Sequence, residues 1–339
     1  MRKHLLRTLL VTLALVSPVP MAVGAVSLNG AGATFPYPLY SKWFDAYAKQ
    51  TGIKINYQSI GSGGGIQQLK ARTVDFGASD APLSDAEMRE MPAPVVHIPT
   101  VAGAVAVVYN VPGARAGLRL DGPVLADIYL GRIRRWDDKR IAALNPGIRL
   151  PGRVIAVVHR SDGSGTTYIF THYLAAVSPT WRANPGAAKS VNWPAGIGAK
   201  GNEGVAGIVQ HVPGAIGYVE LAYAMQTHLP MAALKNRAGR FVLPGVQSAA
   251  AAAAGGVAAM RRDVRVSVVN SPGANAYPIT GFTYILAYRH QANTPKGRAL
   301  VGFLRWAMHE GQRYPASLFY VPLPPAVVAL NDKAIASIR

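Results

Sequence analysis

Hydroxyl side chains stand beside glycines in three segments of the 339-residue chain, each between an apolar run and a helical pattern. The segments read NGAGATF at 29–35, GSGGG at 61–65 and HRSDGSGTT at 159–167. The hydroxyls that start the following helices are those of Thr34, Ser62, Ser164 and Thr166. A helix N-terminus has free N–H groups and about half a positive charge, so it attracts anions. The three segments therefore predict an oxyanion site.

Each of these hydroxyls has a second interpretation, which is an ordinary helix N-cap without any ligand. For one segment taken alone, the N-cap is the better interpretation. Three such segments in one chain, one of them with Arg160 beside its hydroxyls, favour a bound oxyanion. We therefore expect the three segments to meet at one site, with both interpretations open for each hydroxyl.

A carboxylate follows a fourth apolar run. The segment VDFGASD at 74–80 predicts a strand that ends in Ser79 and Asp80. Asp80 could instead cap the helix indicated by SDAE at 84–87, or lie in solvent. Few other acids accompany it, since the chain has 16 Asp and Glu in total, and no pair of carboxylates is placed for acid–base catalysis.

The elements around these segments alternate between strand and helix. Residues 53–59, 101–109, 154–158 and 282–288 predict strands, and Tyr40, Trp43, Phe44 and Tyr47 have the spacing of a buried helix face. Residues 249–254 form an alanine run that predicts a helix ended by Gly255. This alternation predicts an α/β protein with largely parallel sheets, whose ligands bind at the carboxyl ends of the strands.

The first 25 residues predict a cleaved signal peptide. Arg2, Lys3 and Arg7 precede the apolar run TLLVTLALV, and small residues at 23 and 25 form a cleavage pattern. The apolar run is too short to span a bilayer, which takes about 20 residues. No cysteine follows, so we expect no lipid anchor. The expected mature chain runs from Val26 to Arg339 and is exported to the periplasm.

Composition and motifs exclude several classes of functional site. The chain has no cysteine, which excludes disulfides, thiolate metal sites and a cysteine nucleophile. Neither a nucleotide P-loop, nor G-x-S-x-G, nor His-Glu-x-x-His is present, so no cofactor and no metal site is expected. The net charge is +19, but its basic residues are scattered. We therefore expect no nucleic-acid partner. The positive charge indicates either a solvated basic surface or a surface whose electric field attracts anionic ligands or a membrane.

The glycine-rich segments, in this order, resemble those of high-affinity periplasmic phosphate-binding proteins from Pst-type ABC phosphate transporters. The resemblance covers most of residues 26–339 and weakens after Leu221. The segments that carry it are LNGAGATFPYPLYSKW (28–43), INYQSIGSGGG (55–65), VDFGASDAPLSD (74–85), LADIYLGRIRRWDD (125–138), VVHRSDGSGTT (157–167) and PGAIGYVE (213–220).

The resemblance implies a type II periplasmic binding fold, in which two α/β domains close by a hinge around phosphate. Domain I would comprise 26–107 and 275–339, and domain II would comprise 108–274. The implied phosphate ligands are Thr34, Phe35, Ser62, Asp80, Arg160, Ser164, Gly165 and Thr166. Asp162 would pair with Arg160 and hold its guanidinium. The implied function is binding, not catalysis: a monomer delivers inorganic phosphate to the permease subunits in the membrane.

The proposed role of Asp80 separates phosphate from other oxyanions. An ionised carboxylate accepts hydrogen bonds, and phosphate near neutral pH still has a proton to donate, whereas sulfate has none. Asp80 thus opposes the alternative of a sulfate receptor. The other alternative is an exported phosphomonoester hydrolase with Ser164 or Thr34 as nucleophile. It needs a general base or metals near the hydroxyl, and Asp80 alone is a poor substitute.

Overall fold

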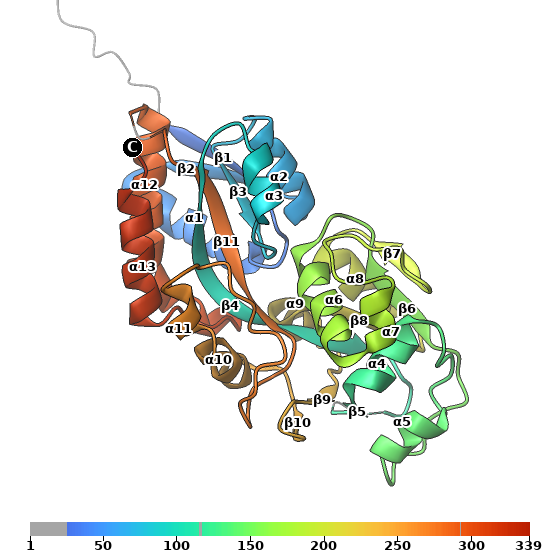
Figure 1. The fold of residues 1–339 in the computed structure, drawn as a ribbon. Helices are drawn as coiled ribbons and strands as arrows, with labels where there is room; N and C mark the ends of the chain where they lie inside the picture. The colour runs from blue at the N-terminus through green and yellow to red at the C-terminus, as the bar shows by residue number, and fades with distance from the viewer. Residues whose placement is uncertain (1–25, 115–116, 292) are drawn as a thin grey trace, which may run out of the picture.

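The computed structural model describes residues 26–114, 117–291 and 293–339, in which one long strand joins two groups of elements (Figure 1). The expected signal peptide, residues 1–25, lies outside the described residues. Within the described ranges, no helix is long and apolar enough to cross a membrane.

The first group, which we call the first lobe, contains the N-terminal and C-terminal elements. Its strands are β1 (Ser27–Gly32), β2 (Lys54–Ser59), β3 (Phe76–Ser79), β11 (Thr280–Tyr288) and the start of β4 (Val95–Tyr109). Its helices are α1 (Tyr37–Thr51), α2 (Ser62–Lys70), α3 (Asp85–Glu90), α12 (Pro295–Met308) and α13 (Pro325–Ala336), with the short 3-10 helices η1 (Glu310–Arg313) and η2 (Ala316–Leu318).

The second lobe is built on the end of β4 and three further strands, β6 (Ala156–Arg160), β7 (Ile197–Ala199) and β8 (Ala215–Glu220). Its helices are α4 (Gly122–Tyr129), α5 (Lys139–Leu144), α6 (Gly165–Val177), α7 (Pro179–Ala183), α8 (Gly201–His211) and α9 (Leu221–Gln226). A small sheet beside it contains β5 (Arg119–Leu120), β9 (Ala233–Lys235) and β10 (Phe241–Val242).

Strand β4 belongs to both lobes. In the described residues the main sheet has the order β2-β1-β3-β11-β4-β8-β6-β7. Up to Ala104, β4 pairs with β11, and from Val105 onward it pairs with β8. The lobes are therefore joined through the middle of one strand.

The expectation of largely parallel sheets holds only at the two ends of this order. The pairs β2-β1, β1-β3, β8-β6 and β6-β7 are parallel, whereas β3-β11, β11-β4 and β4-β8 are antiparallel. Two of these antiparallel pairs involve β11, which comes from the distant C-terminal part of the chain and enters between β3 and β4, and the third joins β4 to β8 across the lobes. Local strand–helix alternation does not report such a pairing.

The two helices α10 (Val246–Ala254) and α11 (Val257–Met260) follow the small sheet in the chain. Helix α10, which contains the predicted alanine run, packs against β4 and β11, and α11 packs against α13. The domain limits expected from the sequence, 26–107 with 275–339 and 108–274, stay a prediction.

The predicted strands are present with shifted ends. Strand β2 matches the prediction to one residue, β4 begins at Val95 instead of Val101, and β6 covers Ala156–Arg160 instead of 154–158. The predicted helix face is confirmed in α1, where Tyr40, Trp43, Phe44 and Tyr47 are buried. Tyr40, Phe44 and Tyr47 pack with aromatic residues of β2, β3 and α12, namely Tyr57, Phe76 and Phe303.

The glycine-rich segments at 29–35 and 61–65 lie partly inside regular elements, not in open loops. Strand β1 runs to Gly32, and α2 begins at Ser62. A Cβ on Gly65 would lie 2.4 Å from Cα of Gly32, and one on Gly32, whose φ is +146°, would lie 2.1 Å from the carbonyl oxygen of Ala78. The glycines therefore let α2, β1 and β3 approach closely, and this packing fixes where Ser62 points.

Candidate functional site

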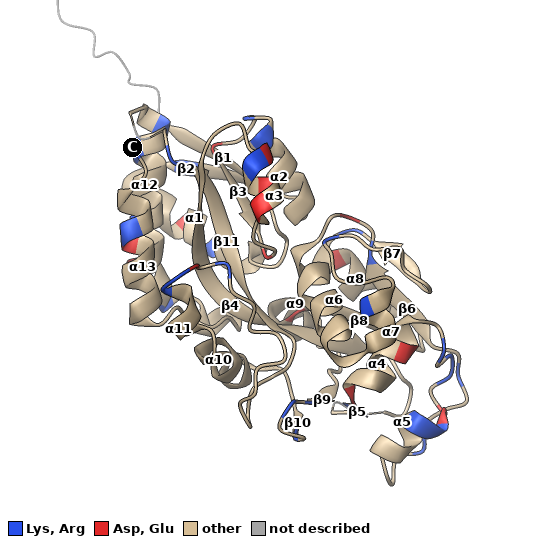
Figure 2. Ribbon diagram, viewed as in Figure 1, with Lys and Arg blue, Asp and Glu red and all other residues tan. Residues whose placement is uncertain are grey.

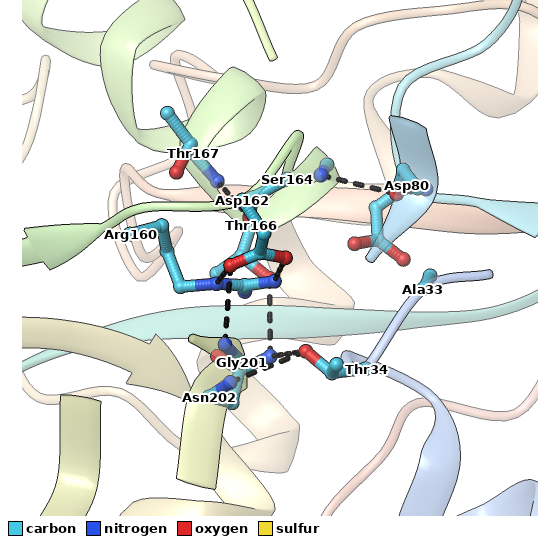
Figure 3. Close-up of polar contacts among 12 residues, drawn as sticks. Ala33, Thr34, Asp80, Arg160, Asp162, Ser164, Thr166, Thr167, Gly201 and Asn202 are labelled. Carbon is cyan, nitrogen blue, oxygen red and sulfur yellow. Dashed lines mark hydrogen bonds and ion pairs between the residues drawn. The ribbon is translucent and has the colours of Figure 1, made fainter. Parts of the chain in front are cut away.

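The predicted site residues come together between the two lobes. In Figure 3, Thr34 and Asp80 from the first lobe face Arg160, Asp162 and Thr166 from the second. Thr34 and Asp80 follow β1 and β3, Arg160 ends β6, and Asp162 and Thr166 come after it; the carboxyl ends of these strands meet here. The residues predicted to bind the ligand through their side chains are buried, namely Thr34, Ser62, Asp80, Arg160, Ser164 and Thr166, and so is Phe35, which is predicted to bind through its backbone N–H.

Arg160 ends β6 and is the buried cation of the site. Its Nε and Nη2 donate to the two carboxylate oxygens of Asp162 at 2.7 and 2.5 Å, the pairing implied by the resemblance. Burial alone lowers the pKa of Arg160, but the paired carboxylate outweighs it and raises that pKa above its ordinary value. Nη1 is turned away from Asp162, toward Oγ1 of Thr166 at 3.4 Å. Arg160 therefore stays charged and is held rigid by Asp162.

Aromatic residues support Arg160 from behind. Its backbone N–H donates to the Tyr218 hydroxyl at 3.2 Å, and that hydroxyl lies 2.6 Å from Oγ1 of Thr167 in α6. The ring of Tyr218 stacks on Phe170, with centroids 4.1 Å apart. Strand β6 and the first turn of α6 are thus locked together, and this sets the distance between Arg160 and Thr166.

Asp80 follows β3 and is 3% exposed. Its Oδ1 accepts a hydrogen bond from Oγ1 of Thr283 in β11 at 2.8 Å. Burial raises the pKa of Asp80 to about 7, although Thr283, Arg160 and Thr166 all act to lower it. A Cβ on Gly165 would lie 2.6 Å from Oδ2 of Asp80, so this second oxygen faces the 159–167 segment across the lobes. It is the acceptor that the arrangement offers to a ligand.

Ser62 connects the lobes directly. Its Oγ accepts from the backbone N–H of Asp80 at 3.2 Å and from that of Gly165 at 3.0 Å. Close by, the N–H of Gly63 donates to the carbonyl of Gly163 at 2.7 Å. The 61–65 and 159–167 segments therefore contact each other, as the sequence predicts for parts of one site.

The N-cap interpretation holds for one of the three segments. Oγ of Ser164 accepts from the N–H of Thr167 at 3.0 Å and caps α6. The residues that cap α1 and α2 are Pro36 and Gly61, neither of which makes a side-chain capping bond. Thr34 and Ser62 are therefore buried hydroxyls with other partners. The suggestion that Asp80 caps α3 is wrong, because Ser84 and Glu87 form a capping box there.

Two tyrosines fix the backbone of Thr34 and Phe35. The Tyr223 hydroxyl donates to the Thr34 carbonyl and the Tyr320 hydroxyl to the Phe35 carbonyl, both at 2.6 Å. Because α9 and the segment after η2 supply these tyrosines, distant parts of the chain orient this loop.

Asn202 and Thr283 also belong to the site, although the sequence patterns did not indicate them. Asn202 lies in the first turn of α8, directly after β7, and its Nδ2 donates to Oγ1 of Thr34 at 2.7 Å. The segment IGAKGNEG at 197–204 is a fourth junction of strand, glycine and helix, and this signal could have revealed it. Thr283 carries no local signal, since only the pairing of β11 with β3 brings it beside Asp80.

The many lysines and arginines are distributed over both lobes (Figure 2). Several on the second lobe are in surface ion pairs; for example, Arg132 and Arg140 both contact Asp127, and Arg135 contacts Asp137. Within the part of the chain that the structure describes, no group of three or more histidines and acids could hold a metal ion.

The arrangement suits an anion that also carries a proton. Hydroxyls, backbone N–H groups and one guanidinium converge from the two lobes, and they can stabilise negative charge away from water. Among them, Asp80 presents an oxygen that can accept a proton from the ligand.

The sequence resembles known proteins over most of its length. The profile of the PBP superfamily domain matches residues 20–310. The phosphate-binding protein PstS of Xylella fastidiosa (strain 9a5c) is 47% identical over 305 residues, which are 90% of this chain and 83% of that protein. PstS of Pasteurella multocida (strain Pm70) is 46% identical over 315 residues, covering 93% and 91%. PstS of Methanocaldococcus jannaschii is 38% identical over 340 residues, covering 93% and 87%.

Solved structures share the fold. A high-affinity periplasmic phosphate-binding protein, PfluDING, bound with phosphate at pH 8.5, has a TM-score of 0.68 and 25% identity, covering 90% of this chain and 92% of that one. A phosphate-binding protein from Stenotrophomonas maltophilia has a TM-score of 0.70 and 21% identity, covering 92% and 94%. The expected two-lobed α/β binding-protein fold is confirmed.

The raised pKa of Asp80 makes stability depend on pH. A buried acid with a folded pKa of about 7, above its ordinary 3.8, favours the folded state below pH 3.8, and this advantage is lost as the pH rises through 7. In phosphate-free protein, Asp80→Asn should therefore have a higher free energy of unfolding than the wild type. This difference should grow between pH 4 and 7 and level off above pH 7. Urea denaturation across this range measures it.

Asp162→Asn is the matched control. The ion pair with Arg160 lowers the pKa of Asp162 despite partial burial, so the difference between this variant and the wild type should be flat from pH 5 to 8. An Asp80→Asn difference that is the same at pH 5 and pH 8 would contradict the account of Asp80.

Proposed function

The chain belongs to the PstS family of phosphate-binding proteins, and from this we propose that it captures inorganic phosphate between its two lobes and delivers it to an ABC-type phosphate import permease. It is a solute-binding component of transport and not an enzyme. The proposed ligands are Thr34, Phe35, Ser62, Asp80, Arg160, Ser164, Gly165 and Thr166, with Asp162 holding Arg160.

One observation carries this proposal: a buried carboxyl, Asp80, faces a set of hydrogen-bond donors contributed by both lobes. A site made of donors alone would suit any oxyanion. With an acceptor among the donors, a phosphate that keeps a proton makes one more hydrogen bond, whereas sulfate leaves Asp80 unpaired or repels it. The position of Asp80 therefore supports phosphate over sulfate.

Export and partners complete the proposal. We propose that residues 1–25 direct export to the periplasm and are removed, and that a monomer then docks on the permease subunits in the membrane. The names of two solved structures with this fold support the route: one is a periplasmic phosphate-binding protein, and the other is a putative phosphate ABC transporter substrate-binding protein.

The exported protein should begin at Val26, without an attached lipid, because the cleavage pattern ends at Ala25 and the chain has no cysteine to accept one. Intact-mass measurement of protein recovered from the periplasm checks this. A retained N-terminus or an added lipid mass would contradict it.

The proposed function is tested by isothermal titration of refolded, phosphate-free protein with phosphate and then with sulfate. Stoichiometric binding of phosphate, with sulfate far weaker, supports it. The same protein is incubated with a chromogenic phosphomonoester. Turnover would favour the hydrolase alternative, and sulfate bound as tightly as phosphate would favour a general oxyanion receptor.

Arg160→Ala should weaken phosphate binding about 100-fold or more, because a charge-assisted contact is lost in a buried site and Asp162 loses its partner. Arg134→Ala is the matched control. Arg134 is exposed, so its effect is limited to screened attraction over a distance. Titration calorimetry at low and high salt measures both. Equal losses that vanish in high salt would show that diffuse charge governs binding.

Asp80→Asn should let sulfate compete better with phosphate than it does in the wild type. The amide keeps the shape and its oxygen can still accept the ligand proton, so phosphate binding changes little. The NH₂ group offers a donor to an anion that has no proton, so the penalty against sulfate falls. Phosphate titrations with and without excess sulfate measure this. Unchanged competition by sulfate would show that Asp80 does not discriminate.

A further inference from the structure

Three hydroxyls of the site share one feature: each accepts two hydrogen bonds. Ser62 Oγ accepts from the N–H groups of Asp80 and Gly165 at 3.2 and 3.0 Å. Thr34 Oγ1 accepts from the backbone N–H and from Nδ2 of Asn202, at 3.3 and 2.7 Å. Thr166 Oγ1 accepts from Nη1 of Arg160 and from Nδ2 of Asn202, at 3.4 and 3.2 Å.

A hydroxyl has two lone pairs and one proton. When both lone pairs accept from N–H groups, the hydroxyl can form one more hydrogen bond, and only as a donor. The three hydroxyls are therefore set to donate, which is the polarity that an oxyanion needs. For Thr166 the neighbouring acceptor is Asp80, whose pKa a hydrogen bond from this hydroxyl helps to lower. For Ser62, two backbone N–H groups impose this polarity. For Thr34 and Thr166, the side-chain amide of Asn202 supplies one of the two donors.

Asn202 is itself fixed in orientation. It is fully buried, and its Oδ1 accepts from the backbone N–H of Glu220 at 2.9 Å. That contact assigns the oxygen to the Glu220 side, so the NH₂ group must face the two threonines. A flipped amide would bring its oxygen to Thr34 and Thr166 and would leave the N–H of Glu220 facing a donor.

Asn202 also connects the lobes. It lies at the start of α8 in the second lobe, as Thr166 does in α6, whereas Thr34 follows β1 in the first. The amide thus touches one proposed ligand from each lobe without being counted among the ligands (Figure 3).

We propose that Asn202 is a positioning residue that fixes the hydroxyls of Thr34 and Thr166 as hydrogen-bond donors toward phosphate, and thereby couples closure of the lobes to recognition. This inference rests on the proposed function, since it names phosphate as the acceptor. It concerns a residue that does not itself need to touch the ligand.

Asn202→Asp tests the proposal at nearly constant volume. A carboxylate oxygen in place of Nδ2 accepts where the amide donated, so the hydroxyls of Thr34 and Thr166 turn toward it and no longer face the ligand. Those same hydroxyls satisfy the new carboxylate, so the variant should fold. Phosphate affinity should fall about 100-fold, more than for Asn202→Ala, which removes the amide but captures no hydroxyl and should cost about tenfold. A role in packing alone predicts the opposite order, because Asp fills the space of Asn and Ala does not.

A double-mutant cycle separates hydroxyl polarity from added charge. Thr34→Val should weaken phosphate binding about tenfold in the wild type, but less than about threefold in Asn202→Asp, where that hydroxyl already points away from the ligand. Thr280→Val is the matched control, since its buried hydroxyl donates to the Tyr277 carbonyl at 2.9 Å and should leave affinity unchanged. Titration calorimetry gives each affinity, and urea denaturation verifies folding.

The outcomes are distinguishable. Equal losses from Thr34→Val in both backgrounds would show that Asn202 acts by charge or packing, which overturns the proposal. If Asn202→Asp does not fold, the same cycle is measured with Asn202→Ala. A double variant whose loss of phosphate affinity equals the product of the two single losses would overturn the proposal, and a smaller combined loss would support it. If the wild-type protein does not bind phosphate, the proposed function is wrong. If it binds phosphate but the affinity losses from Asn202 and Thr34 substitutions multiply, only the proposed role of Asn202 is wrong.

Discussion

The structure depends on how it compensates charged groups that have no access to water. Arg160 and Asp80 are both buried between the lobes, where an unpaired charge is costly. Arg160 is neutralised within its own loop by Asp162, through two hydrogen bonds that also fix its direction. Among the residues that the structure describes, no cation is bound to Asp80 directly; it accepts from Thr283, and burial keeps its pKa near neutrality. The cation is thus permanently paired, and the carboxyl is the group whose charge can still change.

The topology explains why such a site lies between lobes. Five parallel-paired strands end at the site, and the residues just after β1, β2, β3 and β7, together with the end of β6, supply its side chains. Because β4 is shared, the lobes are connected through a strand close to these ends. Contacts such as Gly165 with Ser62 and Asn202 with Thr34 cross from one lobe to the other. The site is therefore complete only where the two lobes meet.

The sequence allowed the residues that converge between the lobes to be predicted better than the sheet. Thr34, Ser62 and Arg160 lie in local patterns of strand, glycine and helix, and such patterns depend on neighbours in the chain, so they can be recognised without the fold. Thr283 lies within an apolar strand and acquires its role only when β11 pairs with β3. The antiparallel middle of the sheet was missed for the same reason. Asn202 was in principle visible, but its NH₂ group gains meaning only once Oδ1 is assigned to Glu220.

The pKa of Asp80 finally bears on how a proton can discriminate between anions. An anion brought next to an ionised Asp80 in a buried site is repelled unless a proton lies between them. Phosphate near neutral pH brings that proton. Sulfate brings none, so Asp80 has to take one from water, and the free energy this costs increases as the pH rises above about 7, the pKa of Asp80. In the proposed function, burial of Asp80 therefore serves two purposes: it makes the proton necessary, and it sets the pH above which Asp80 no longer takes a proton readily from water.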